Sequence, residues 1–478
     1  MVPATLISAA VPQSAKMVFE QFYLGCLAHA SYLVGSDGLA VVVDPQRDVD
    51  IYIETARKHG LNIAWIIETH LHADFVSGHL ELAERTGATI CLGEGSGATF
   101  LHQPVGDGHS IEFGSVGLVF RATPGHTPES VCIVLTDSGK GPDPYAVFTG
   151  DTLFIGDVGR PDLSDQFTPQ ELASLLYDSL HNCLLALPDE TLVYPAHGAG
   201  SMCGRNISAD RTSTIGRERR TNYALQPMSR EAFVELLTAD LPPRPEYFQQ
   251  DVQANRTGAP ALAQLPPMQL LSPAEVAQRQ LEGTLVLDVR PGSLFGNGFV
   301  PGSVNIGLGG QFAAWAGAII GLNRDVILVA EDSKAADESR MRLARVGIDR
   351  VVGILEDGIL GWVRAARPLA LIEQITAPEL SELLHSTPVP VIDVRRQGEW
   401  NHGHLPHSQL RPLDEMARAI TAKPDSGPTV VHCQSGYRSI IACSLLAAAG
   451  YTNLLNLQGG YDAWSRAGRP TEQETDAA

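Results

Sequence analysis

The stretch that decides the fold is Thr69-His70-Leu71-His72-Ala73-Asp74-Phe75. It follows residues 64–68, an apolar run that predicts a buried strand. A His-x-His-x-Asp-His pattern after a buried strand supplies ligands to two metal ions, but here Phe75, which has no lone pair, stands in the last position. The stretch therefore indicates a metal site with one ligand missing, and it favours one-metal chemistry over two-metal hydrolysis.

Three further turns carry metal-ligand residue types, and each follows an apolar run and contains a glycine. They are Pro124-Gly125-His126-Thr127, Thr149-Gly150-Asp151-Thr152 and Pro195-Ala196-His197-Gly198. A lone histidine after a strand is more often structural than a ligand. Four such turns in one chain, however, predict side chains that are presented from loops to a shared metal.

Composition limits the function classes. The chain has 478 residues, which predicts several cores, and its 34 Lys+Arg against 54 Asp+Glu give a net charge of −20. This charge argues against binding to nucleic acid or to anionic membranes, and no apolar run reaches the ~18 residues of a membrane span. The seven cysteines show no paired spacing, which is typical of a reducing compartment, so we expect a cytoplasmic protein.

The second half of the chain repeats itself after a Pro- and Gly-rich boundary at residues 255–267. Residues 286–290 (VLDVR) return as 391–395 (VIDVR), and Trp362 and Trp464 close two similar glycine-containing segments. In each copy short apolar strands alternate with helical stretches, which predicts a parallel sheet covered by helices. We therefore expect three domains, at residues 1–256, 268–368 and 372–470.

With these four turns, residues 17–250 resemble the metallo-β-lactamase fold. The resemblance implies an α/β fold, an αββα sandwich with the metal at the ends of two sheets. Residues 156–162 (GDVGRPD) are similar to the persulfide dioxygenase subgroup. That subgroup implies a single Fe(II) held by His70, His126 and Asp151, with zinc as the alternative metal. The groups then expected to orient ligands, bind substrate or move protons are His72, Asp74, Arg160, His197 and Cys203. Cys203 is a candidate to hold or relay a persulfide, and a buried structural thiol is the alternative.

A second reactive centre is predicted in the last domain, where residues 430–439 read VVHCQSGYRS. Here Cys433 follows a buried strand and precedes a helix, so free backbone N–H groups, the helix dipole and Arg438 all favour a thiolate. Residues 375–470 resemble a rhodanese, which implies a sulfurtransferase. Its loop, from Cys433 to Arg438, is one residue shorter than the loop of the related phosphatases. The match departs at His407, where the family usually has glycine.

The middle copy keeps the frame of the repeat without its chemistry. After the apolar run 327–330 it has Glu331-Asp332-Ser333-Lys334, so a carboxylate stands where the thiol would be. This copy resembles a degenerate rhodanese, for which packing, spacing or dimerisation is the expected role.

Together the two resemblances imply a sulfide detoxification enzyme. A low-molecular-weight persulfide such as glutathione persulfide would be oxidised by O₂ to sulfite, and Cys433 would transfer sulfur and make or use thiosulfate. We also expect a homo-oligomer. Two alternatives stay open: a metal hydrolase of glyoxalase II or lactonase type with rhodanese appendages, and a sulfur-binding sensor without turnover.

Overall fold

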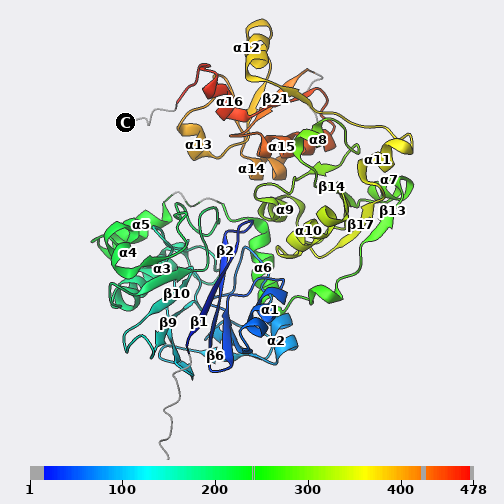
Figure 1. Cartoon of the computed structure of the whole chain (residues 1–478). Coiled ribbons are helices and arrows are strands. Elements are labelled where there is room, and N and C mark those ends of the chain that lie inside the picture. Colours follow the sequence, from blue (N-terminus) through cyan, green and yellow to red (C-terminus); the bar gives the residue numbers. More distant parts are fainter. Residues whose placement is uncertain (1–15, 240, 242, 421–426, 474–478) are drawn as a thin grey trace, which may run out of the picture. The chain divides into compact units, whose positions relative to one another are not determined.

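The computed structural model describes residues 16–239, 241, 243–420 and 427–473 (Figure 1). The chain forms two compact units, one from residues up to 244 together with 248–263, and one from 245–247 together with residues from 264 onward. Residues 1–15 of the first predicted domain lie outside the described residues. Within the described ranges, no helix is long and apolar enough to cross a membrane.

The first unit contains two six-stranded sheets in which neighbouring strands follow chain order. The first sheet is β1 (Val18–Leu24), β2 (His29–Ser36), β3 (Leu39–Val43), β4 (Asn62–Ile67), β5 (Thr89–Gly93) and β6 (Gln103–Val105). The second sheet is β7 (Ser110–Phe113), β8 (Val116–Ala122), β9 (Val131–Asp137), β10 (Ala146–Gly150), β11 (Leu192–Pro195) and β12 (Ser213–Thr214). Strands β3 to β6 run parallel, and β10 pairs in parallel with β11.

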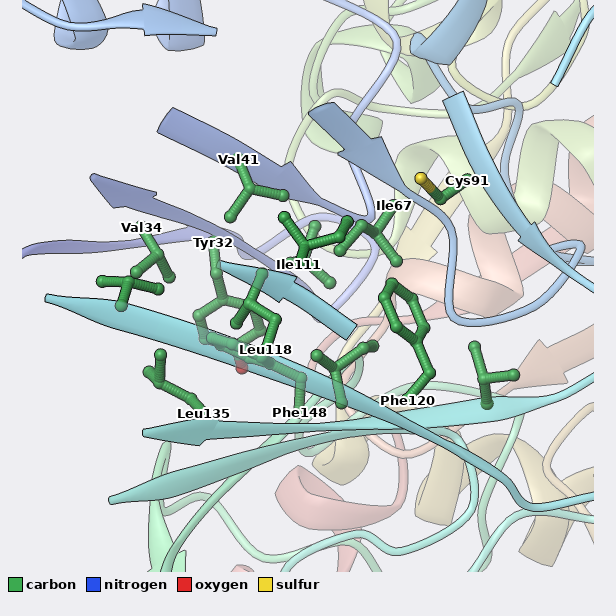
Figure 2. Packing of buried hydrophobic residues seen from close by; sticks show 14 of the residues in the cluster. Tyr32, Val34, Val41, Ile67, Cys91, Ile111, Leu118, Phe120, Leu135 and Phe148 are labelled. Carbon is green, nitrogen blue, oxygen red and sulfur yellow. The ribbon is translucent and has the colours of Figure 1, made fainter. Parts of the chain in front are cut away.

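The two sheets pack face to face, because alternate residues of each strand point inward. In β2, Tyr32 and Val34 lie in the central cluster, whereas Leu33 between them faces the outer helices. Figure 2 shows this central cluster, with Tyr32 and Val34 from the first sheet facing Leu118 and Phe148 from the second.

Helices cover the outer face of each sheet. Tyr52 and Leu82 pack on the first sheet, and Leu176 and Phe233 pack on the second. The helices of this part of the chain are α1 (Asp50–Lys58), α2 (His79–Thr86), α3 (Pro169–Asp178), η1 (Ser179–Leu184), α4 (Ile215–Thr221), η2 (Tyr223–Leu225), α5 (Arg230–Thr238), α6 (Glu246–Thr257) and η3 (Leu262–Gln264). The predicted αββα sandwich is confirmed.

The second unit contains two five-stranded parallel sheets, one from each copy of the repeat. The strand orders are β13-β17-β16-β14-β15 and β18-β22-β21-β19-β20. The strands are β13 (Gln269–Leu271), β14 (Leu285–Asp288), β15 (Val304–Asn305), β16 (Val326–Val329), β17 (Val351–Leu355), β18 (Glu373–Ile375), β19 (Val391–Asp393), β20 (Gln409–Leu410), β21 (Thr429–His432) and β22 (Leu454–Leu457). The two predicted parallel α/β folds are confirmed.

Local sequence signals fix the helices of both copies. The first helix of each copy begins with a capping box, Ser272 with Glu275 and Thr376 with Glu379, in which each side chain bonds the other's backbone N–H. The helices are α7 (Pro273–Leu281), α8 (Gly292–Gly296), α9 (Phe312–Ile320), α10 (Ser333–Ala344), α11 (Gly358–Arg364), α12 (Ala377–Ser386), α13 (Gln397–Asn401), α14 (Leu413–Ala419), α15 (Tyr437–Ala448) and α16 (Gly460–Arg466).

The turn at His407 forms despite the missing glycine. The N–H of Ser408 donates to the carbonyl of Leu405 at 3.2 Å, and His407 adopts a left-handed φ of 59°. The middle copy has Gly302 at the matching place, with a φ of 79°. A left-handed conformation costs a residue with a Cβ ~1–2 kcal/mol, so His407 is strained where Gly302 is not.

We therefore expect His407→Gly to raise the free energy of unfolding. The relieved strain exceeds the added entropy of the unfolded chain, which leaves a net gain of about 0.5–1 kcal/mol. Chemical denaturation of the full-length protein, followed through the unfolding transition of the second unit, measures this change in the free energy of unfolding. The matched control is Gly302→Ala, which introduces the strain and is expected to lower the stability; an H407G protein no more stable than the parent would contradict the explanation.

Candidate metal centre and thiol loop

Three loops at neighbouring strand ends bring His70, His126 and Asp151 together. His70 follows β4, His126 follows β8 and Asp151 follows β10, and all three side chains are buried. Oδ2 of Asp151 lies 3.3 Å from Nε2 of His126 and 3.8 Å from Nε2 of His70. Each residue thus offers one ligand atom to a common point. Within the described residues, Nε2 of His126 and Oδ2 of Asp151 make no hydrogen bond, as expected of atoms that bind a metal.

Hydrogen bonds behind the two imidazoles fix which nitrogen faces this point. Nδ1 of His126 donates to the carbonyl of Arg160 at 2.9 Å. Nδ1 of His70 lies 3.0 Å from Oγ1 of Thr69, which in turn donates to Oδ2 of Asp44 at 2.9 Å. Since a carbonyl only accepts, and since the threonine proton is given to the carboxylate, both Nδ1 atoms carry hydrogen. The Nε2 lone pairs are left for a metal.

Burial and neighbouring charges keep His70, His126 and Asp151 in the protonation states that metal binding requires. Burial lowers the pKa of both His70 and His126, so the imidazoles stay neutral. Burial alone would raise the pKa of Asp151, but the neighbouring histidines, His197 first, hold it well below its usual range. Two neutral nitrogens and one carboxylate, all buried, form a donor set that suits a divalent transition metal.

His197 bridges two carboxylates. Its Nδ1 lies 2.8 Å from Oδ1 of Asp151, and its Nε2 lies 3.0 Å from Oδ2 of Asp74. Burial would lower the pKa of His197, but these carboxylates raise it well above its usual value. The ring is therefore an imidazolium whose Nδ1 donates to Asp151 and whose Nε2 forms an ion pair with Asp74. It orients the oxygen of Asp151 that does not face the metal point.

His72 points toward a different pair of acids. Its Nε2 lies 3.2 Å from Oδ1 of Asp44 and 3.3 Å from Oε2 of Glu68. Burial would lower the pKa of His72, yet the two carboxylates raise it to about 10. The ring of Phe75 lies beside it, with ring centroids 4.4 Å from His72 and 4.2 Å from His29. The place of the missing ligand is thus filled by a buried hydrocarbon ring.

His72, Asp74 and His197 still bring three possible ligand atoms within reach of each other. We expect Phe75→His to add the absent nitrogen donor, so that zinc can displace the protons on the charged rings of His72 and His197 and raise the number of metal ions bound per chain from one toward two. Elemental analysis after equilibration with excess zinc measures the ratio. Phe75→Leu is the matched control, because leucine is apolar and supplies no lone pair; an F75H protein that still binds one ion would show that Phe75 does not exclude the second.

Cys203 and Arg160 lie next to the centre and are linked to each other. The N–H of Arg160 donates to the carbonyl of Cys203 at 3.0 Å, and the Arg160 guanidinium forks onto Asp162 at 2.6 and 2.8 Å. The Cys203 thiol groups with Asp151 and His197, and burial raises its pKa well above the usual value. Cys203 is therefore a neutral thiol at the edge of the centre, and Arg160 contacts His126 through its carbonyl.

Sequence reasoning missed several groups that hold the ligand loop in place. Asn255 in α6 donates from Nδ2 to the carbonyls of His72 and Phe75, both at 2.8 Å, and accepts from the N–H of Ser77. Glu129 accepts from the N–H of Leu71 at 3.0 Å. Of the residues that support this loop, Asp44 is indicated by the sequence, because it directly follows the apolar run of β3. Asn255 is not, because it lies in a helix far along the chain.

The thiol loop of the last domain joins β21 to α15. Cys433 is buried, and its Sγ accepts from the N–H of Gly436 at 3.1 Å. The guanidinium of Arg438 donates two hydrogen bonds to the carboxylate of Glu399, at 2.6 and 2.7 Å. The Cys433 sulfur therefore meets the N–H of Gly436 at the start of α15, whose dipole favours a thiolate.

In the middle copy a carboxylate lies at the start of the corresponding helix, α10. The carboxylate of Asp332 caps α10 and accepts from the N–H of Ala335 at 2.8 Å. Val329 pairs with Asp288 as His432 pairs with Asp393, so Ala330 matches Cys433 and the prediction of a carboxylate at the thiol position is wrong. The carboxylate lies instead at the helix start, where it caps α10.

Comparison with known proteins agrees with this division of the chain. The Metallo-beta-lactamase superfamily model matches residues 24–197, and the Rhodanese-like domain model matches residues 272–365 and 376–467. The fold and the buried His/Asp cluster thus define a metallo-β-lactamase-fold protein with two rhodanese domains.

Relatives narrow the class further. The chain is 34% identical over 233 residues to the mitochondrial persulfide dioxygenase ETHE1 of Bos taurus, covering 47% of this chain and 82% of that protein. A crystal structure of a metallo-beta-lactamase from Staphylococcus aureus matches with 32% identity and a TM-score of 0.65, covering 72% of this chain and 99% of the other. A hydroxyacylglutathione hydrolase of Tolumonas auensis is 35% identical over 170 residues, or 35% of this chain and 60% of that protein. The chain belongs to the persulfide dioxygenase family.

Proposed function

We propose that the chain is a sulfide detoxification enzyme that combines a persulfide dioxygenase with a sulfurtransferase. In this proposal residues 1–256 hold the dioxygenase, 268–368 the degenerate rhodanese and 372–470 the active one. The observation that carries the first activity is the convergence of two neutral Nε2 atoms and one oxygen of Asp151 on a buried point. With Phe75 beside His72 and His197 held between two acids, the donor set suits one metal ion.

His70, His126 and Asp151 would hold Fe(II). This ion would supply the redox chemistry by which O₂ oxidises the outer sulfur of a persulfide. The overall change balances when the outer sulfur gives four electrons to O₂, both atoms of O₂ and one oxygen from water end on sulfite, and the carrier leaves as a thiol. The chain's own residues orient the ligands: Thr69 and the carbonyl of Arg160 fix the imidazoles, and His197 fixes Asp151.

The second activity rests on Cys433 at the start of α15. The Cys433 thiolate attacks the outer sulfur of a persulfide or of thiosulfate, the S–S bond breaks, and a thiolate or sulfite leaves. Attack by sulfite on the Cys433 persulfide then makes thiosulfate, and attack by a thiol makes a new persulfide. Both directions use the same loop, in which the N–H of Gly436 supports the sulfur anion.

The alternative is a thioester hydrolase, which the similarity to a hydroxyacylglutathione hydrolase favours. An oxygen electrode separates the two. With glutathione persulfide as substrate we expect one O₂ consumed for each sulfite formed, and no hydrolysis of S-lactoylglutathione. Hydrolysis of that thioester without oxygen uptake would overturn the proposal.

A further inference from the structure

The middle domain makes contact with the helix that carries the thiol loop. Three residues of α15 face it, namely Tyr437, Ile440 and Ser444, and their spacing places them on one side of the helix. Figure 1 shows α15 beside α8 of the middle domain, and α15 also packs against β15. The buried residues of α15 thus contact both copies of the repeat.

Specific polar bonds fix this contact. The hydroxyl of Tyr437 donates to the carbonyl of Gly307 at 2.8 Å. Two turns further along the helix, Oγ of Ser444 accepts from the N–H of Asn305 at 2.9 Å. Both partners lie in the segment at and after β15, so one short stretch of the middle domain holds both ends of the contact.

Close packing adds to these bonds. A Cβ at Gly292 would lie 2.6 Å from Cγ2 of Ile440. A Cβ at Gly310 would lie 3.3 Å from Cζ of Tyr437, and Gly310 has a left-handed φ of 73°. The middle domain thus has glycines at two points where side chains of α15 lie close to its backbone.

Tyr437 is the first residue of α15, and it directly follows Gly436, whose N–H donates to the sulfur of Cys433 at 3.1 Å. We propose that the degenerate middle domain is a positioning element for sulfur transfer, which holds Tyr437 and thereby keeps the Gly436 N–H on the Cys433 sulfur. The inference rests on the proposed role of Cys433. Helix ends fray unless they are held, so an anchored first residue keeps the loop in a conformation that stabilises a thiolate.

The reactivity of Cys433 with iodoacetamide as a function of pH tests this directly in the full-length protein. The other titratable or charged groups around the loop stay the same in the variants: Asp393, Arg395, Glu399, His432, Arg438, Cys443, Asp462 and, in the middle domain, Arg342. Peptide mass spectrometry reports alkylation at Cys433 alone, so the readout does not depend on turnover.

We expect Tyr437→Phe, which removes only the hydroxyl, to lower the alkylation rate of Cys433 at pH 7 by about 5-fold, the factor that corresponds to one hydrogen bond. The midpoint of the pH profile should move to higher pH. Gly310→Ala, a change made entirely in the middle domain, should shift the alkylation rate and the midpoint in the same directions. The effect of the double variant should be only slightly larger than the larger of the two single effects. Tyr177→Phe is the matched control, because it removes a similar hydroxyl bond, to the carbonyl of Met228, in the first unit.

Unchanged alkylation profiles in both Y437F and G310A would overturn the inference. Chemical denaturation of each full-length variant shows whether the second unit, which carries the substitutions, is folded. If G310A fails to fold, Ser444→Ala, which removes the acceptor for Asn305, replaces it as the second variant. A wild-type protein that transfers no sulfur, yet shows the shifted profile in Y437F, would refute the proposed transferase and leave the positioning role intact.

Discussion

Replacing His126 by alanine is expected to abolish oxygen uptake with a persulfide and to reduce the bound iron. In the proposed metal centre His126 supplies one of three ligand atoms, and its Nε2 lies 3.3 Å from Oδ2 of Asp151. Loss of a direct ligand should exceed the ~10–100-fold effect that is typical of residues behind the ligands, so we expect a loss of more than about 100-fold. Oxygen-electrode rates and iron content of the same preparation measure it.

His181→Ala is the matched control for this experiment. Nδ1 of His181 faces a backbone carbonyl, that of Tyr177, at 2.9 Å, much as Nδ1 of His126 faces the carbonyl of Arg160. His181 lies in η1, on the helical side of the second sheet, so its loss should leave iron content unchanged. An H126A protein with full oxygen uptake would refute the assignment of the ligand.

The second large effect is expected for Cys433→Ser. The hydroxyl that replaces the thiol is not ionised at neutral pH, so it cannot accept a sulfur atom as a thiolate does. Sulfur transfer from thiosulfate to cyanide should fall by about 1000-fold or more, as when other enzymes lose their nucleophile. Oxygen uptake with a persulfide should persist, because the metal site lies in the other unit.

Cys443→Ala is the control for Cys433→Ser. Cys443 lies on the same helix, α15, but burial raises the pKa of its thiol well above the usual value, so it takes no part as a thiolate. Transfer rates should therefore stay close to those of the parent. Unchanged transfer in C433S would show that another group carries the sulfur.

The sequence revealed those features that depend on local order. Polar turns after apolar strands placed His70, His126 and Asp151 at sheet ends, and the repeat of Asp288 and Arg290 as Asp393 and Arg395 indicated one α/β module used twice. In the structure these two acid and arginine pairs form the same buried ion pair in each copy. Such features follow from period and spacing, which a single sequence displays.

The remaining features depend on side-chain direction and on contacts between distant segments. Spacing alone does not indicate that His72 faces Asp44 and Glu68, because residues in a loop have no fixed period. Nor does it indicate that Tyr437 reaches Gly307, which is 130 residues away. For this reason the sequence predicts packing, spacing or dimerisation for the middle copy without deciding among them, and only the structure shows its contact with α15.

The proposed one-iron dioxygenase centre is tested most directly by the metal content of freshly purified protein, measured together with its oxygen uptake. Phe75 fills the place of a missing ligand, and His197 is held between Asp74 and Asp151. We therefore expect about one iron per chain, because this donor set suits a single metal ion, and oxygen consumption with glutathione persulfide that falls when the iron is removed. Two zinc ions per chain, with no oxygen consumption, would contradict it.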